Sequence, residues 1–406
     1  MIADDYIFLA PDWYNGVKIK RAWRNNVLFS LDRSEQRSLL VSYPERSLAF
    51  MLMPMSASEN NYVKRKLYRA KDKVFGVPWW CDRTETTALV NPGSGTTVSV
   101  GSTDYRNFDV GGLCVLIQDE NNYEVKEIVS ITSTTITVDS AFLGTWQTPT
   151  DVYPVLQGRL ITTTNDLKYE TSYISQPLLV EVKESFDGDV TRRTFSGSSY
   201  SSYNGSAVFN RKPNWVGGLT QSVEVFPNIT QYLSKEYSYA FQSEGRIANK
   251  ATHLFESRED IYNVVKFFDE CKGRYEDFWY PTWTDDVVIT APFTNTDTTI
   301  TIEDIEWDSY YKYNDAYGRF VLIVLPDGTE VIRKVISAPT STSLQLDSAI
   351  GYTVTSTYGV MCTFLVFGRF STDDIEVTYV TEEVAESELK FTSILRSGVY
   401  TTTTTV

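Results

Sequence analysis

The chain is poor in the side chains that most enzyme and metal sites require. Its 406 residues include one histidine, His253, and four cysteines at positions 81, 114, 271 and 362, with no CxxC pair among them. A structural zinc site needs thiolates or imidazoles that converge on one ion, and this spacing argues against one. We therefore expect buried free thiols, no metal and no cofactor.

Long apolar runs are also absent. No stretch approaches the roughly 20 apolar residues that cross a bilayer, and the start MIADDYIFLAPDW lacks the basic and apolar regions of a secretory signal. The sequence thus predicts synthesis and assembly in a cytoplasm without direct membrane insertion. The formal charge of −15 repels a phosphate backbone, so nucleic acid is not an expected partner.

Catalytic constellations are equally sparse. Serine and cysteine hydrolases need a base that titrates near neutral pH, which here would have to be His253, and no GxSxG elbow is present. A glycosidase would need two carboxylates with separated pKa values. Candidates include pairs of adjacent acids that read as turns or strand ends, where acids usually face water: Asp119-Glu120, Asp285-Asp286, Asp373-Asp374 and Glu382-Glu383. Nothing singles out a catalytic pair, and we expect no enzyme activity.

What the chain has in quantity is aromatic residues, at 14%, including 26 tyrosines. Aromatic residues favour strands, and they also supply large interfaces or sugar-binding faces. Composition alone does not choose among these uses.

The chain also repeats itself. An ordered series of short matches, at offsets near 200 residues, covers both halves and indicates an internal duplication. The matches include Pro11-Asp12-Trp13 with Pro213-Asn214-Trp215, Thr96–Val100 with Thr298–Ile302, Gly112–Ile117 with Gly318–Ile323, Glu124–Ser130 with Glu330–Ser337, and Gly158-Arg159-Leu160 with Gly368-Arg369-Phe370.

One helix is predicted in each half. Ser58 and Ser257 are the expected N-caps, because a serine hydroxyl accepts hydrogen bonds from free amides at a helix start. Apolar stripes at helical spacing follow them, namely Val63, Leu67, Ala70 and Val74 in the first half and Ile261, Val265 and Phe268 in the second. Each helix leads into an aromatic cluster that contains Trp79 and Trp80, or Trp279 and Trp283. We expect these tryptophans to plug a junction within the core.

The rest of each half alternates with the period of strands, so we predict an all-β protein of two tandem modules with one helix each. The modules span residues 1–190 and 207–396. Each combines a β-sandwich or tube-like part with an inserted small β-barrel, at about 84–157 and 287–367. A Ser/Gly/Tyr-rich linker covers 191–206, and a Thr-rich tail covers 397–406.

The predicted first helix is strongly basic, with Lys64, Arg65, Lys66 and Arg69, whereas its counterpart carries Arg258, Glu259, Asp260, Asp269 and Glu270. A solvated charged face is the simplest interpretation. The alternative is that two equivalent helices contact different neighbours of opposite charge, which makes the four basic residues interface candidates.

The order of helix, Phe278-Trp279-Tyr280-Pro281-Thr282-Trp283 and a strand-rich segment that ends in Gly368-Arg369-Phe370 resembles tail-tip (baseplate) proteins of siphophages, the distal tail and hub proteins. The resemblance implies a virion structural protein that closes the tail tube as a ring. Its implied partners are the tail tube, hub, tape measure and receptor-binding or fibre proteins.

The chain departs from typical distal tail proteins, which are shorter and carry one tube-like domain. A duplicated module is similar to hubs, in which three chains with two domains each match a six-fold tube, so a trimer or a hexamer is expected. Two other classes stay open. One is a virion glycan-binding adhesin, with the tyrosines of 199–203 stacking on sugars, and the other is a cell-wall or capsule hydrolase.

Overall fold

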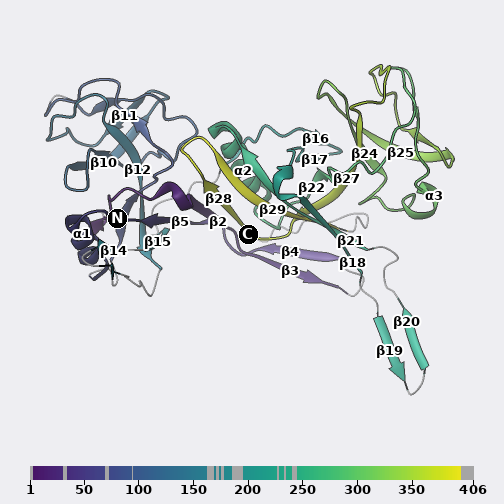
Figure 1. The fold of residues 1–406 in the computed structure, drawn as a ribbon, viewed down its shortest axis with the longest axis horizontal. Helices are drawn as coiled ribbons and strands as arrows, with labels where there is room; N and C mark the ends of the chain where they lie inside the picture. The colour runs from purple at the N-terminus through teal and green to yellow at the C-terminus, as the bar shows by residue number, and fades with distance from the viewer. Residues whose placement is uncertain are drawn as a thin grey trace.

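The computed structural model describes residues 3–30, 34–68, 73–93, 95–161, 169–170, 173–174, 178–184, 195–225, 228–232, 235–239 and 245–394. Strands dominate this part of the chain, and they pair almost entirely in antiparallel fashion (Figure 1). The predicted all-β class is therefore confirmed. The Thr-rich tail at 397–406 lies outside the described residues.

The first half begins with a series of strands, and one short helix lies between the fifth and sixth of them in the sequence. Its elements are β1 (Asp5–Tyr6), the 3₁₀ turn η1 (Trp13–Asn15), β2 (Val17–Ala22), β3 (Asn25–Phe29), β4 (Glu35–Leu39), β5 (Glu45–Leu52), α1 (Ala57–Tyr68) and β6 (Phe75–Pro78). β5 shows why these segments become strands, because every second residue is buried and the intervening ones are half-exposed.

A small barrel follows within the first half. It comprises β7 (Thr84–Glu85), β8 (Thr97–Ser99), β9 (Leu113–Ile117), β10 (Tyr123–Ile131), β11 (Thr135–Val138) and β12 (Asp151–Leu160). The pairings run β12–β9–β10–β11–β8, and a bridge from Val100 to Thr86 leads back to β7 and β12. This closed ring of strands encloses its own apolar core around Val98, Leu116 and Phe142. β13 (Tyr169–Glu170), β14 (Tyr173–Ile174) and β15 (Leu178–Glu184) complete the half.

The second half follows a similar order of elements. It contains β16 (Ser202–Tyr203), β17 (Ser206–Ala207), η2 (Trp215–Gly217), β18 (Leu219–Glu224), β19 (Asn228–Tyr232), β20 (Lys235–Tyr239), β21 (Arg246–Phe255), α2 (Arg258–Cys271), β22 (Phe278–Pro281), β23 (Thr299–Thr301), α3 (Trp307–Tyr310), β24 (Phe320–Val324), β25 (Glu330–Thr340), β26 (Ser343–Leu346), β27 (Met361–Phe370), β28 (Asp374–Tyr379) and β29 (Ala385–Ser393). The four-residue α3 falls inside the second barrel region, where the sequence predicted only strands and turns.

The strand pairings follow the same order in both halves. In the first, β2 pairs with β5, β5 with β15, β15 with β12 and β12 with β6. In the second, β18 pairs with β21, β21 with β29, β29 with β27 and β27 with β22. This parallel order is what an internal duplication predicts; common ancestry of the two halves stays a prediction.

The helix boundaries correct two details of the sequence analysis. The N-cap of α1 is Ser56, whose hydroxyl accepts a hydrogen bond from the Glu59 amide at 3.1 Å, and Ser58 lies inside the helix. Ser257 caps α2 as predicted. Val74 does not belong to the helical stripe, because it directly precedes β6, where it is buried. Ala70 lies outside the described residues.

The two halves share one apolar core. A single cluster joins buried residues of the first half, such as Phe50 and Phe75, to residues of the second, such as Phe267 and Phe391. The connection between the halves contributes to this packing, since Tyr200 lies against Phe209 and Phe267. In the described part of the Ser/Gly/Tyr-rich linker, the aromatic residues Phe195, Tyr200 and Tyr203 pack against the second half, while most of the small residues between them are exposed.

Candidate functional site

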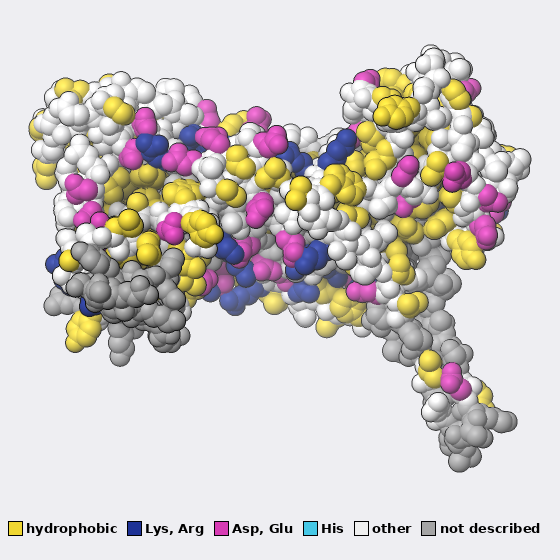
Figure 2. Space-filling model, viewed as in Figure 1, with side chains coloured by type: hydrophobic (Ala, Val, Ile, Leu, Met, Phe, Trp, Pro, Cys, Tyr) yellow, Lys and Arg dark blue, Asp and Glu magenta, His cyan; other side chains and the backbone are white. Residues whose placement is uncertain are grey.

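Several buried ion pairs lie where the two halves meet. β2 of the first half pairs with β28 of the second along six residues, from Val17 opposite Tyr379 to Ala22 opposite Asp374. One sheet therefore runs across both halves, and Figure 2 shows basic and acidic side chains intermingled over this middle region. We call the contact of β2, β3, β4 and the turn at Cys81-Asp82 with β21, α2, β27 and β28 the internal seam.

One face of β2 is buried against the second half. Val17, Ile19 and Arg21 alternate with exposed or half-exposed lysines, and Arg21 enters the shared core. The Nε of Arg21 donates to Asp269 of α2 at 3.2 Å, and a second guanidinium nitrogen forms an ion pair with the same carboxylate. The indole of Trp23 and the amide of Phe195 also donate to Asp269, at 3.3 and 3.0 Å.

Asp269 is fully buried and therefore depends on these donors. A carboxylate removed from water costs several kcal/mol unless charges and hydrogen bonds replace its hydration. Here one guanidinium, one indole and one backbone amide do so. Loss of either partner would leave the other as a buried, uncompensated charge.

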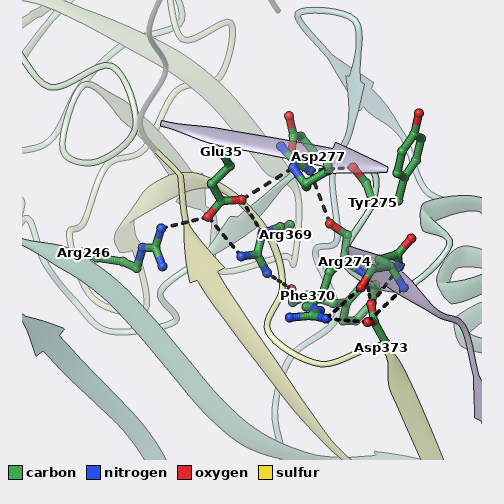
Figure 3. A network of polar contacts seen from close by, with 10 residues as sticks. Glu35, Arg246, Arg274, Tyr275, Asp277, Arg369, Phe370 and Asp373 are labelled. Carbon is green, nitrogen blue, oxygen red and sulfur yellow. Dashed lines mark hydrogen bonds and ion pairs between the residues drawn. The ribbon is translucent and has the colours of Figure 1, made fainter. Parts of the chain in front are cut away.

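The β3–β4 hairpin reaches across the seam and ends in a second buried cluster (Figure 3). Glu35 accepts hydrogen bonds from Arg369 of β27, with Nε at 2.8 Å and Nη2 at 3.0 Å, and from Nη2 of Arg246 of β21 at 2.8 Å. Arg37 lies 3.5 Å from the same carboxylate and forms an ion pair with Asp277 at 2.6 Å. The hairpin of the first half thereby contacts β21, β27 and the turn before β22 in the second half.

A third contact fixes the base of the hairpin. Asp373 accepts hydrogen bonds from the side chain of Asn25 at 2.7 Å and from Nη2 of Arg274 at 2.6 Å. Asn25 also donates to the carbonyl of Lys272, directly after α2. Lys272 adopts the left-handed conformation that ends the helix, so the helix end itself forms part of the docking surface.

These surroundings shift the acids in different directions. Burial alone would raise the pKa of Glu35, but the hydrogen bond and charge of Arg369, with Arg246 and Arg37, outweigh it and lower the pKa. The pKa of Asp373 is lowered in the same way, since Arg274 and Asn25 outweigh its burial. The pKa of Asp277 is raised, because burial exceeds the effect of Arg37.

A further buried pair closes the other end of the seam. Arg258, the first residue of α2, forms an ion pair with Asp82 and donates to the carbonyl of Cys81 at 2.6 Å. Asp82 also accepts from the side chain of Asn107 at 2.6 Å. The turn that follows Trp79 and Trp80 in the first half is therefore held against α2 of the second half.

The second half has a counterpart of the surface formed by η1 and β2, namely η2 and β18, and this counterpart is exposed. The turns η1 and η2 match closely: their caps Asp12 and Asn214 have φ of −79° and −78°, and the following Gly16 and Gly218 both have φ of 72°. A Cβ on Gly16 would lie 2.8 Å from the Tyr379 carbonyl of β28, whereas a Cβ on Gly218 would meet nothing within 4 Å.

The strand after this turn shows the same difference. The face of β2 that is buried corresponds to an exposed face of β18, and among the described residues β18 pairs only with β21. Figure 1 shows the β19–β20 hairpin projecting away from the body, while its counterpart β3–β4 lies along the second half. We call η2, β18 and the β19–β20 hairpin the open face.

The predicted site residues fall into two groups. The four tryptophans predicted to plug a junction are all buried. Trp80 packs against Phe50 and Tyr153, and Trp279 packs against Phe320 and Phe367. The guanidinium of Arg46 lies over Trp79, and the ammonium of Lys212 lies over Trp283. Each therefore contributes to core packing at the start of a barrel.

The basic residues of α1 lie outside the internal seam. Lys66 forms an ion pair with Asp5, the Nε of Arg65 donates to the Asn61 carbonyl at 3.3 Å, and Lys64 is exposed. Arg69 lies outside the described residues. No side chain of the described part of α1 takes part in the internal seam's ion pairs given above, whereas Asp269 and Arg258 of α2 do.

Two of the residues considered for catalysis, His253 and Asp286, are held by packing or hydrogen bonds within the fold. His253 is buried between Phe209 and Phe391, and burial lowers its pKa to about 4. Asp286 accepts hydrogen bonds from the Phe364 amide and the Thr284 hydroxyl, both at 2.8 Å. In the described part of the chain, no three His, Cys, Asp or Glu side chains gather as a metal site would require.

The tyrosines of 199–203 are also engaged in packing, since Tyr203 lies against Trp279 and Phe320. None of the described helices combines the length and the apolar character of a bilayer-spanning helix. No family model matches the chain, and no curated protein matches its sequence.

Sequence reasoning missed the residues that build the seam. Asp269 was noted only as one charge among several on the second helix, and Glu35 was not noted at all. Arg369 was recognised as part of the repeated Gly-Arg motif, which was the one available signal. The three lie far apart in the chain, so no local pattern could join them.

Proposed function

We propose that this protein is a structural component of a bacteriophage long-tail tip, without catalytic turnover. In this role it forms a ring or hub at the distal end of the tail tube and connects the tube to host-recognition proteins. The observation that supports the proposal is the repeated surface: the internal seam covers one copy of it, and the open face presents the other.

A contact of this kind is heterologous, because it joins the β2 side of one module to the β28 side of another. Heterologous contacts generate rings when the rotation closes. A module pair joined head to tail within one chain, with a second open face at its end, can repeat the same rotation between chains. Three chains would supply six modules, which suits a tube of six-fold symmetry.

An open strand edge adds weight to this interpretation. Within the described part of the chain one edge of β18 pairs with β21 and the other has no strand partner, and exposed edges of this kind pair with other chains unless they are protected. Val223 and Val225 are 61% and 74% exposed at this edge. Exposed valines beside a strand edge that has no described partner are readily explained by another chain that covers both.

The proposal is tested by locating the protein on particles. An antibody or a small tag placed on the second barrel, away from the open face, should mark the distal end of the tail in electron micrographs of purified virions. Reconstruction of the same particles should show a ring of this chain between the tube and the receptor-binding proteins. Absence of the chain from purified virions would defeat the proposal.

A further inference from the structure

We infer that copies of this chain join through a second seam in which an apolar contact replaces the buried ion pair of the internal seam. The inference rests on the proposed ring and adds its residues. The occupant of the open face is the first half of the next copy, at the end of its α1. The internal seam identifies this occupant, because it covers the end of α2, and the end of α1 lies at the same distance from its serine cap.

The correspondence between the two seams follows from local geometry. Arg21 is the fifth residue of β2 and Val223 is the fifth residue of β18, and both strands follow the same glycine turn. On the opposing side, Asp269 and Tyr68 both lie twelve residues after the serine cap of their helix (269 − 257 and 68 − 56). The contact of Arg21 with Asp269 thus corresponds to a contact of Val223 with Tyr68 of the next copy.

The exposure of these residues agrees with that assignment. Arg21 and Asp269 are buried in the internal seam, whereas Tyr68 is 90% exposed and Val223 lies on the open edge. Val225 occupies the position that corresponds to Trp23, two residues further along. Valines opposite a tyrosine form a contact that needs no charge compensation and is stabilised by burial.

Because one seam contains a charged pair and the other an apolar pair, only matching surfaces would bind each other. If β2 met the α1 side of another copy, Arg21 would lose its carboxylate and face a tyrosine. If β18 met the α2 side, Asp269 would face valine and lose its guanidinium. Each mismatch buries an unpaired charge, which is strongly unfavourable. Specificity obtained by penalising the wrong partner in this way would keep copies in one head-to-tail order.

A second pair retains its charges. Glu236 and Glu35 each lie ten residues before the first residue of the following strand, Arg246 of β21 or Glu45 of β5 (246 − 236 and 45 − 35). Arg159 and Arg369 each follow the barrel-closing glycine of the repeated Gly-Arg motif. Glu236 and Arg159 are both exposed, so the projecting hairpin would place Glu236 on Arg159 of the next copy, as Glu35 lies on Arg369.

The test uses substitutions that exchange one kind of contact for the other. The full-length chain should assemble in solution by light scattering, and Val223→Arg or Tyr68→Asp alone should abolish the assembled species. The double variant, which recreates the arginine–aspartate pair of the internal seam, should regain it. Val129→Arg and Tyr358→Asp are matched controls, because they alter exposed residues of the barrels, and both should assemble normally.

The charged pair gives an independent measurement. Glu236→Arg and Arg159→Glu should each abolish assembly, and the double reversal should restore it, with far-ultraviolet circular dichroism unchanged throughout. Unaltered assembly of the single variants, or failure of both double variants to recover, would overturn the inference. A wild-type chain that stays monomeric in solution would also overturn it. The proposed function is judged separately, by whether virions carry the chain at the tail end.

Discussion

Replacing Glu35 by glutamine removes one negative charge from a buried site that three arginines surround. The carboxylate accepts two hydrogen bonds from Arg369 and one from Arg246. Glutamine keeps one carbonyl acceptor and places an amide group where the second oxygen accepted, so Arg369 is left buried without its counter-charge. Breaking a buried ion pair on one side costs about 3 to 5 kcal/mol, and we expect the free energy of unfolding to fall by that amount.

The matched control is Glu376→Gln. Glu376 pairs with Lys18 across the same β2–β28 strand pair at 2.9 Å, but the two side chains are 48% and 46% exposed. Exposed ion pairs contribute about 0.2 to 1 kcal/mol, so this substitution should cost less than about 1 kcal/mol. The assay is urea denaturation followed by tryptophan fluorescence, with hydrogen exchange of the β3–β4 amides to detect local undocking of the hairpin.

The pH dependence provides a further check. The pKa of Glu35 is lowered from its ordinary value of 4.5, so as the pH falls the unfolded chain takes up this proton before the folded one does. The advantage of wild type over Glu35→Gln should be complete above pH 4.5 and should disappear as the pH falls through the lowered pKa. A cost equal to that of Glu376→Gln, or a difference that persists unchanged to pH 3, would refute this account of the seam.

Three further predictions concern other parts of the molecule. Burial lowers the pKa of His253 to about 4, so between about pH 6.5 and 4 the unfolded chain binds a proton that the folded chain does not. The free energy of unfolding of wild type should therefore fall by up to about 3 kcal/mol over this range, and an equal fall in a His253→Phe variant would contradict this. Gly16→Ala should destabilise the fold through its clash with the Tyr379 carbonyl in addition to backbone strain, whereas Gly218→Ala, at the same φ of 72° and a similar ψ, should cost the backbone strain alone, about 1 to 3 kcal/mol, and weaken assembly; unfolding curves and light scattering separate the two, and equal losses of stability would argue against the difference in environment. All four cysteines are buried, and burial raises the pKa of Cys114 to about 12, so a thiol reagent at pH 8 should modify none until the chain unfolds; rapid labelling of the native chain would show that burial to be wrong.

Much of the local structure could be predicted from the sequence, because it depends on contacts between neighbours in the chain. The period-two pattern of Thr96–Val100 and Thr298–Ile302 predicts strands, and both segments contain one, at Thr97–Ser99 and Thr299–Thr301. Ser257 was identified as a helix cap from its position alone. The prediction of Ser58 instead of Ser56 was wrong because both serines precede the same apolar stripe, and only the accepted hydrogen bond distinguishes them.

The seam could not be predicted in this way. Its pairs join residues 248 and 334 positions apart, Arg21 with Asp269 and Arg369 with Glu35, and sequence spacing carries no information on such contacts. Acids such as Asp373 were expected to face water, since they follow a strand end. In the folded chain this carboxylate instead receives Asn25 and Arg274, because the hairpin of the other half lies over it.

The sequence by itself determined the strand-rich class, the two helices and the repetition of elements, since these depend on periodicity and on residues close together in the chain. Only the tertiary structure decided how the two sets of strands meet, which arginines are buried and which copy of the repeated surface is left open. The physical reason is that burial of charge depends on what the other half places opposite each residue. That partner is chosen by the packing of strands hundreds of residues apart.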